Sequence, residues 1–311
     1  NPEDVNEIFM GVVGEGVFHS INGGDSSWKC SNGFPSRAGR VSVQMCASNK
    51  NRVYCLIEGP NPADTTQNSL GYVLVSNDNG VSWKTVISAD GGIFGSNNQG
   101  YYDNFIQVHP TNPDIAYFGG IDFYLTTNGG SNWTNISNSY SGGGVHPDQH
   151  ACAFNPLNPN EVYMANDGGM YRSGGLDQPF ESINNGYEVT AYYAMDVDYT
   201  ASNKTYGGTQ DNGTSGSTGP SLDWRGVLGG DGFFVAVSPL DPNTIYCENY
   251  NGTVKTVNLG TGRVSNNVAG IPSRDSVGAW SSPIVLDRGT ATLYHGRKAV
   301  YQQGVGTVSY T

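Results

Sequence analysis

The stretch SNDNGVSW at residues 76–83 decides the fold, because weaker copies of it recur along the chain. A second copy, TTNGGSNW at 126–133, keeps the hydroxyl, the Asx side chain, the glycine and the tryptophan at the same offsets. A third copy spans 20–28 with one extra residue, and a degraded copy begins at Ser173. A motif that returns every roughly 40–50 residues is typical of a stacked or circular array. The residues expected to build the two clearest turns are Ser76, Asp78, Gly80, Trp83, Thr126, Asn128, Gly130 and Trp133.

A second pattern interleaves with the first: an apolar run, a turn rich in proline and asparagine, and another apolar run. It occurs at residues 105–118, 151–164 and 234–246. Proline fixes φ, and Asn and Asp accept turn geometry, so each copy predicts two strands joined as a hairpin. The repeats divide the chain into seven units, near 1–40, 41–104, 105–148, 149–190, 191–232, 233–280 and 281–311.

These repeats predict an all-β protein in which residues 1–311 form one seven-bladed β-propeller of four-stranded antiparallel blades. The first unit lacks its first strand, because residues 1–4 already read as a turn. The run 305–310 either supplies that strand or is the last strand of the seventh unit, and removal of residues before Asn1 is a third explanation. No segment shows a sustained 3.6-residue apolar period, so helices should be minor.

Composition excludes several classes of partner. The chain has 15 Lys and Arg against 27 Asp and Glu, which gives a formal charge of −12. Nucleic-acid binding needs a basic face, and docking on anionic lipid needs basic clusters. No apolar run reaches the roughly 18 residues of a membrane span, so no membrane insertion is expected, and no signal peptide is visible. The five cysteines read as small core residues, with a Cys30–Cys46 disulfide as the alternative.

Residues 76–83 resemble the Asp-box, or BNR, repeat. Further motifs at 99–104, 146–151, 166–172, 208–213 and 229–232 resemble those of secreted bacterial propellers of the sortilin-like and xyloglucanase-like type. The resemblance implies a secreted or cell-surface protein in which the repeat itself is structural. A sialidase would need a trio of arginines for the sialate carboxylate, and no such trio stands out, so that activity is rejected.

The unusual residues are expected on one face of the propeller. In a four-stranded blade, the B–C and D–A connections share a face, and loops on one face of a rigid scaffold commonly carry function. Exposed tyrosine rings there can stack on sugars, and carboxylates can bind hydroxyls or cations. The residues predicted to bind a ligand are Tyr101, Tyr102, Asp103, Asp148, Asp167, Asp211 and Asp231.

The run from His146 to His150 is a candidate metal site. In an extended conformation, His146, Asp148 and His150 would project to one side and offer two imidazoles and a carboxylate to a transition metal. Neighbouring carboxylates would instead favour Ca²⁺. The structural alternative is that these side chains hydrogen-bond adjacent loops. No cofactor is certain, and Ca²⁺ or another divalent cation is the one expected.

Asp167 is also a candidate catalytic residue. Its loop resembles the one that carries a catalytic aspartate in the xyloglucanase family, and glycoside hydrolysis needs a second carboxylate, for which Asp211 and Asp231 are candidates. Those enzymes work in a cleft between two propellers, whereas this chain has residues for one. We therefore expect a non-catalytic propeller that binds a glycan or an extracellular protein on its acidic loop face. The alternatives are a glycoside hydrolase acting on β-glucan and a purely structural domain of a larger surface protein.

Overall fold

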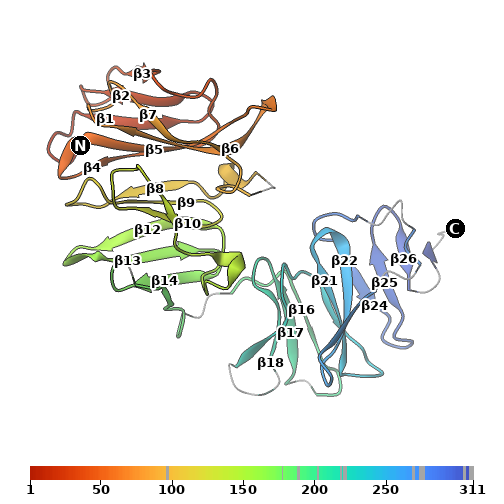
Figure 1. The fold of residues 1–311 in the computed structure, drawn as a ribbon. Coiled ribbons are helices and arrows are strands. Elements are labelled where there is room, and N and C mark those ends of the chain that lie inside the picture. The colour runs from red at the N-terminus through yellow and green to blue at the C-terminus, as the bar shows by residue number, and fades with distance from the viewer. Residues whose placement is uncertain are drawn as a thin grey trace. The chain divides into compact units, whose positions relative to one another are not determined.

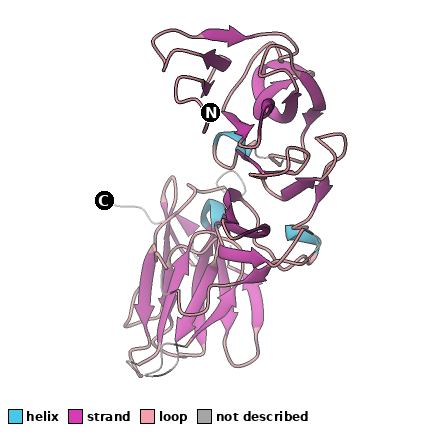
Figure 2. Cartoon of the chain, turned by 90° about the vertical axis from the view of Figure 1, so that its left-hand side faces the viewer, coloured by secondary structure: helices cyan, strands magenta, loops and turns pink. Residues whose placement is uncertain are grey.

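The computed structural model describes residues 1–95, 98–176, 178–187, 190–201, 203–217, 219, 223–267, 270–272, 277–303 and 306–307. The chain divides into two compact units, Asn1–Tyr187 and Glu188–Thr311, which are described separately (Figure 1). The only helices among the described residues are single 3₁₀ turns, η1 (Gln99–Tyr101), η2 (Ser139–Ser141) and η3 (Tyr250–Gly252) (Figure 2). In this part of the chain, no helix has the length and apolar character needed to cross a membrane.

The first unit contains four antiparallel sheets whose strands follow one another in chain order. Their strands are β1 (Ile8–Val12), β2 (Gly16–Ser20) and β3 (Trp28–Cys30); β4 (Val41–Cys46), β5 (Asn49–Asn61), β6 (Asp64–Ser76) and β7 (Lys84–Asp90); β8 (Phe105–Val108), β9 (Ala116–Gly119), β10 (Phe123–Thr126) and β11 (Thr134–Asn135); and β12 (Gln149–Asn155), β13 (Asn158–Asn166), β14 (Gly169–Ser173) and β15 (Glu181–Ser182).

The second unit contains three more sheets of the same kind. Their strands are β16 (Ala194–Val197), β17 (Thr205–Thr209), β18 (Gly213–Ser217) and β19 (Trp224–Leu228); β20 (Val235–Val237), β21 (Thr244–Asn249), β22 (Thr253–Asn258) and β23 (Arg263–Asn266); and β24 (Ile284–Leu286), β25 (Leu293–Gly296), β26 (Val300–Gln302) and β27 (Gly306–Thr307).

Each of the seven sequence ranges holds one sheet, and six of the sheets have four strands. The first sheet has three strands, as its missing first strand predicts. β27 pairs with β26 as the fourth strand of the seventh sheet. Residues 306–307 therefore do not supply a strand to the first sheet. The remainder of that run lies outside the described residues.

The proline- and asparagine-rich segments form the predicted hairpin connections. Between β8 and β9, the His109 Nδ1 atom accepts hydrogen bonds from the backbone N–H groups of Thr111 at 3.3 Å and Asn112 at 3.1 Å. Between β20 and β21, Asp241 Oδ1 accepts the N–H of Asn243 at 3.1 Å. Side chains thus satisfy turn amides that the strands cannot, which is why these residue types mark the connections.

The repeated turns share one hydrogen-bond pattern. The hydroxyls of Ser20, Ser76 and Thr126 accept the N–H of the glycine four residues later, at 3.0, 2.8 and 3.0 Å. The Oδ1 atoms of Asn22, Asp78 and Asn128 accept the N–H four residues later, at 3.0, 2.8 and 2.9 Å. Gly80 and Gly130 have φ of 80° and 85°, which glycine adopts without strain. The three turns therefore have equivalent backbones despite their different residues.

Apolar side chains fill the spaces between neighbouring sheets. In the first unit, separate clusters centred on Cys55, Leu56 and Tyr117 join the first to the second, the second to the third, and the third to the fourth sheet. In the second unit, Ile245 and Val254 belong to the two clusters that join its three sheets. All five cysteines are free, and four are buried, so the predicted alternative of a Cys30–Cys46 disulfide is wrong in this structure.

Candidate functional site

The turn that follows β7 positions the tyrosines of the first unit. It begins at Asn98, whose φ of 62° is left-handed, and continues through η1. The N–H of Asp103 donates to the Gln99 carbonyl at 3.0 Å and closes the turn. Arg40 secures it from outside, because its Nη1 donates to the carbonyls of Tyr101 at 3.0 Å and Tyr102 at 2.6 Å. The rings of Tyr101 and Tyr102 remain exposed.

Asp167 lies in the tight connection between β13 and β14 and brings two of the predicted residues together. The Tyr102 hydroxyl donates to both of its carboxylate oxygens, at 3.1 Å each. His150 Nε2 lies 2.5 Å from Asp167 Oδ1. The Tyr102 ring meets the His150 ring edge-on, with centroids 4.7 Å apart. Asp167 is therefore held by Tyr102 from the connection between β7 and β8 and by His150 from β12.

Asp148 stands beside this group. Its backbone is left-handed, with φ of 65°, and its N–H donates to the Ile121 carbonyl at 2.9 Å. Gln99 Nε2 donates to Asp148 Oδ1 at 2.9 Å. A carboxylate oxygen of Asp148 lies within 4.8 Å of one of Asp167. Burial, followed by the negative charge of Asp167, raises the pKa of Asp148.

Asp103 is the most unusual carboxyl group of the first unit. It is 0% exposed, and neither of its oxygens has a hydrogen-bond partner among the described residues. Burial, followed by the charge of Asp148, raises the pKa of Asp103 to about 8, with Asp167 adding to the increase and Arg40 opposing it. We call Asp103, Asp148 and Asp167 the carboxylate cluster. A buried carboxyl without a hydrogen-bond partner is costly, and such groups concentrate at functional sites.

The extended conformation assumed for residues 146–150 is wrong. The left-handed φ of Asp148 breaks the two-residue alternation, and β12 starts only at Gln149. The His146 Nδ1 atom lies 3.0 Å from the Pro147 carbonyl, and its Cβ packs so closely on Gly168 that a Cβ there would lie 2.3 Å away. Among the described residues, His146, Asp148 and His150 do not bring three ligand atoms within 4.8 Å of one another.

Asp211 and Asp231 meet in the second unit. The N–H of Asp211, which has φ of 62°, donates to Asp231 Oδ1 at 2.7 Å. The turn after β17 is thus tied to the connection that leads into β20. The predicted catalytic pairing of Asp167 with either residue joins different units and stays a prediction.

An aromatic row lies beside these two aspartates. It consists of Tyr193, Phe233, Trp280 and Tyr250, with successive ring centroids 5.0, 5.7 and 6.2 Å apart. Phe233 is fully buried, whereas the other three rings are between 46% and 54% exposed. The Tyr193 hydroxyl donates to Gln210 Oε1 at 2.6 Å, next to Asp211. A Cβ at Gly230 would lie 3.4 Å from the Tyr250 ring, so this ring lies next to the residue that precedes Asp231.

Tyr250 and Trp280 are not among the residues that the sequence predicted to bind a ligand. They meet because the Asn251 N–H donates to the Trp280 carbonyl at 3.1 Å and the Gly278 N–H donates to the Asn251 carbonyl at 2.8 Å. A tryptophan in the connection between the last two sheets was the available signal.

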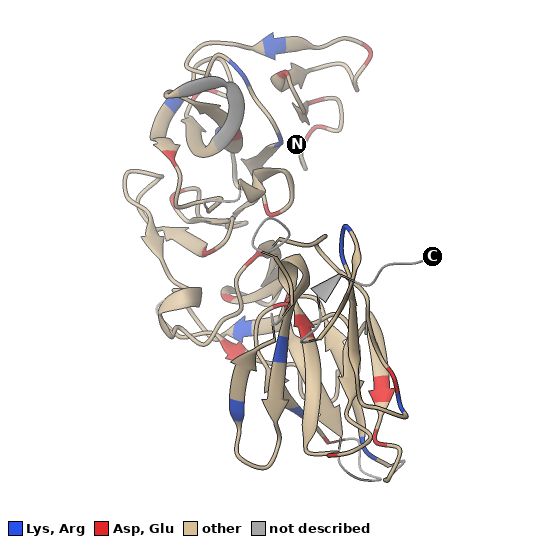
Figure 3. Ribbon diagram, turned by 90° about the vertical axis from the view of Figure 1, so that its right-hand side faces the viewer, with Lys and Arg blue, Asp and Glu red and all other residues tan. Residues whose placement is uncertain are grey.

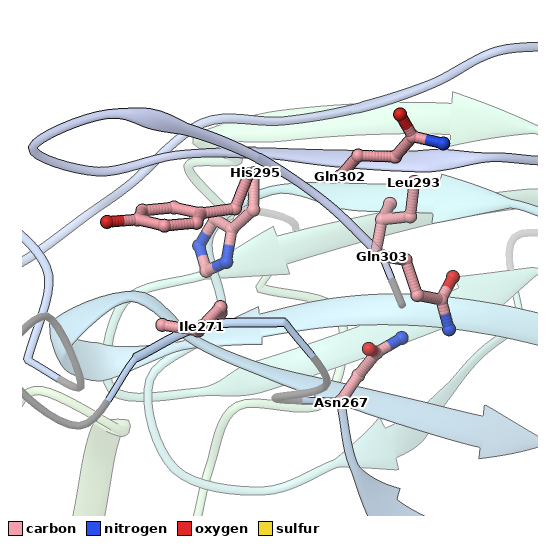
Figure 4. Close-up of a pocket in the computed structure, with 7 residues that line it drawn as sticks. Asn267, Ile271, Leu293, His295, Gln302 and Gln303 are labelled. Carbon is pink, nitrogen blue, oxygen red and sulfur yellow. The ribbon is translucent and has the colours of Figure 1, made fainter. Parts of the chain in front are cut away.

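A small pocket lies between the last two sheets (Figure 4). Asn267, Leu293, His295 and Gln303 are among the residues that line it, and the His295 ring points toward Ile271. His295 is buried, and burial, followed by the charge of Arg297, lowers its pKa to about 4. The ring is thus neutral near pH 7. The pocket is too small for an organic ligand. We therefore interpret His295 as a core residue and not as part of a binding site.

Charge is spread over both units. Among the described residues, Lys and Arg are dispersed over strands and loops rather than gathered on one element (Figure 3).

Comparisons with known proteins establish the fold but no family. No family model matches the chain, and a search of curated proteins found no match. Among solved structures, the chain is similar to the GH74 enzyme of Niastella koreensis, with a TM-score of 0.60, 13% identity, and coverage of 100% of this chain and 47% of that one. The fold class is therefore the seven-bladed β-propeller, as the sequence predicted.

Two further structures are less similar. They are the GH74 xyloglucanase from Xanthomonas campestris, with a TM-score of 0.48, 11% identity, and coverage of 97% of this chain and 50% of that one, and YCF48 bound to D1 peptide, with 0.42, 16%, 97% and 90%. The chain spans about half the length of both GH74 enzymes. At 13% identity, the first similarity shows the fold alone, and the other two add nothing to it.

Proposed function

We propose that the chain is a non-catalytic propeller that binds a glycan, and that the glycan stacks on the aromatic row of the second unit. The observation that carries the proposal is the row itself. Trp280 and Tyr250 are neighbouring half-exposed rings, and half-exposed Tyr193 lies on the other side of buried Phe233; exposed apolar surface of this kind marks an interaction site. Trp280 and Tyr250 stack with an interplanar angle of 18°, so they offer nearly parallel faces.

Polar groups beside the row suit a sugar better than an apolar partner. A sugar ring has an apolar face of C–H groups and a rim of hydroxyls, which need acceptors. Gln210 Oε1 accepts from the Tyr193 hydroxyl, and Asp231 Oδ1 accepts the N–H of Asp211, so an amide and a carboxylate lie close to the row. Buried Phe233 supports the Tyr193 and Trp280 rings from beneath, so little side-chain entropy is lost when a ligand stacks on them.

The location and context of this function follow the resemblance to secreted Asp-box propellers. We propose a secreted or cell-surface protein within which this chain is one domain. Fractionation of the source cells tests the location, and recovery only from the cytosol would contradict it.

The proposal is tested by screening the full chain on a glycan array and then measuring affinity for the best glycan by calorimetry. Replacing Trp280 or Tyr250 by Ala should weaken binding about tenfold or more each, because an aromatic contact contributes roughly 1 kcal/mol beyond its buried area. Trp224→Ala is the matched control, since Trp224 is exposed in the same unit and contacts Tyr192 rather than the row. Binding that survives loss of Trp280, or an empty array together with capture of a defined extracellular protein, refutes the glycan proposal.

The hydrolase alternative has its own test. Asp167 is held by Tyr102 and His150, a geometry that suits an ionised carboxylate. Incubation of wild type and Asp167→Asn with xyloglucan and other β-glucans should give no products from either if the protein only binds. Turnover by wild type that Asp167→Asn abolishes would replace the binding proposal with hydrolysis. Failure to bind any glycan or protein would leave the purely structural role.

A further inference from the structure

The carboxylate cluster of the first unit contains a buried carboxyl group that no hydrogen bond from the described residues stabilises. Asp103 is 0% exposed, and neither oxygen accepts a hydrogen bond from a described residue. The nearby Arg40 guanidinium donates from Nη1 to the carbonyls of Tyr101 and Tyr102. A buried anion without a hydrogen-bond partner is unstable unless a cation or a proton compensates it.

The same unit shows how this protein accommodates a partly buried carboxylate that serves structure alone. Asp122 accepts hydrogen bonds from Ser137 Oγ at 2.7 Å, the Ser139 N–H at 2.8 Å and Asn135 Nδ2 at 2.7 Å. These bonds lower its pKa despite its burial. Asp103, in the connection between β7 and β8, has no equivalent donors among the described residues. The difference points to a compensating ligand rather than to burial as such.

The geometry of the other two carboxylates fits a cation. Asp148 and Asp167 place oxygens within 4.8 Å of each other. Calcium binds oxygens at about 2.3–2.6 Å, so two ligands of one ion lie no more than about 5 Å apart. One turn, residues 98–103, connects the three carboxyl groups. Its Gln99 donates to Asp148, its Tyr102 donates to Asp167, and the N–H of Asp103 closes it.

We propose that Asp148 and Asp167 coordinate a calcium ion and that Asp103 supplies the buried negative charge behind it. The donors are hard carboxylate oxygens from loops, which suits Ca²⁺ better than a transition metal. His150 acts on the outside of the site by orienting Asp167 through its Nε2 contact of 2.5 Å. This site lies in the first unit and does not depend on the glycan proposed for the second, so either proposal can fail without the other.

The test uses the full chain, stripped with a chelator and titrated with CaCl₂ by calorimetry and by thermal unfolding. Wild type should bind one Ca²⁺. Saturating calcium should raise the unfolding temperature of the first unit by about 5–10 °C. Asp148→Asn and Asp167→Asn should each lose at least about tenfold in affinity. Asn tolerates the left-handed φ of position 148, so that variant should fold.

Two further variants separate a lost site from a damaged fold. Asp90→Asn is the matched control, because Asp90 is an exposed turn carboxylate that accepts the Gly92 N–H at 2.8 Å, and it should respond to calcium as wild type does. Asp103→Asn should unfold in chelator at a temperature equal to or above that of wild type, yet should gain less from calcium. This combination would show that Asp103 is kept for the ion and not for stability.

Three results would overturn the proposal. The first is that stripped wild type binds no Ca²⁺, in which case a proton alone compensates Asp103. The second is a calcium response that is unchanged in Asp148→Asn and Asp167→Asn. The third is preferential binding of Zn²⁺ that His150→Ala abolishes, which would assign the site to a nitrogen-ligated metal instead.

Discussion

Glu248 is expected to control how the stability of the second unit depends on pH. Its carboxyl group on β21 is fully buried, and it accepts hydrogen bonds from the N–H groups of Ser282 and Phe234 and from Ser281 Oγ. Burial raises its pKa from 4.5 to about 7, although these hydrogen bonds and the charge of Arg297 oppose the increase. The change to be tested is Glu248→Gln, which keeps the shape and removes the charge.

The sign follows from proton binding. Glu248 holds its proton up to about pH 7 in the folded state but only up to about pH 4.5 in the unfolded state. The proton therefore stabilises the folded state fully below pH 4.5, and this contribution is lost as pH rises through about 7. At 1.36 kcal/mol for each pKa unit, the wild type should lose about 3 kcal/mol relative to Glu248→Gln between pH 4.5 and 8.

The assay is urea unfolding of both proteins at several pH values, with amide hydrogen exchange of β20 and β21 reporting on the second unit. Comparing the two proteins cancels the contributions of the other titrating groups. The free-energy difference between them should change steadily between pH 4.5 and 7 and become constant above. If the two unfolding free energies instead run parallel from pH 4.5 to 8, Glu248 does not hold a proton in the folded state and the burial argument is wrong.

The remaining predictions concern a turn and a core histidine. Ser76→Ala should lower the unfolding free energy of the first unit by about 1–3 kcal/mol, because it leaves the buried Gly80 N–H without its 2.8 Å acceptor; denaturant unfolding checks this, and an equal loss in the exposed control Ser82→Ala would contradict it. His295 has a folded pKa of about 4 against 6.5, so its contribution to stability is lost as pH falls from 6.5 to 4. His295→Phe should remove that loss in thermal unfolding of the second unit, and an unchanged acid response would assign it to another group.

The fold could be predicted from the sequence because its signals are local. The hairpin after β8 and the turn at 76–83 are each fixed by hydrogen bonds between residues two to four positions apart. A short window of sequence therefore contains all the atoms that decide the structure. For the same reason, the three-stranded first sheet could be predicted, because residues 1–4 have the composition of a turn.

The sites could not be predicted to the same extent, because they depend on which connections meet. The alternation expected from His146 to His150 failed at a single φ, that of Asp148, whose N–H donates to the Ile121 carbonyl of another connection. Trp280 meets Tyr250 where backbone hydrogen bonds tie Asn251 to the connection between β23 and β24. The residues lie 30 positions apart, so no local pattern contains the contact.

Two glutamates show why a raised pKa alone does not identify a site in this fold. Glu58 on β5 and Glu248 on β21 lie near the ends of the second strands of their sheets, and burial raises the pKa of both. Each accepts an N–H from the start of the first strand of its own sheet, at 3.0 Å for Arg40 and 3.3 Å for Phe234. The repeated position and the repeated partner indicate a structural role in holding the strand ends. Asp103 has a higher pKa than Glu248 and no such partner among the described residues, and no repeat reproduces its surroundings. The hydrogen-bond partner, not the degree of burial, therefore distinguishes these two glutamates from Asp103, the buried carboxyl group that we place behind the proposed ion.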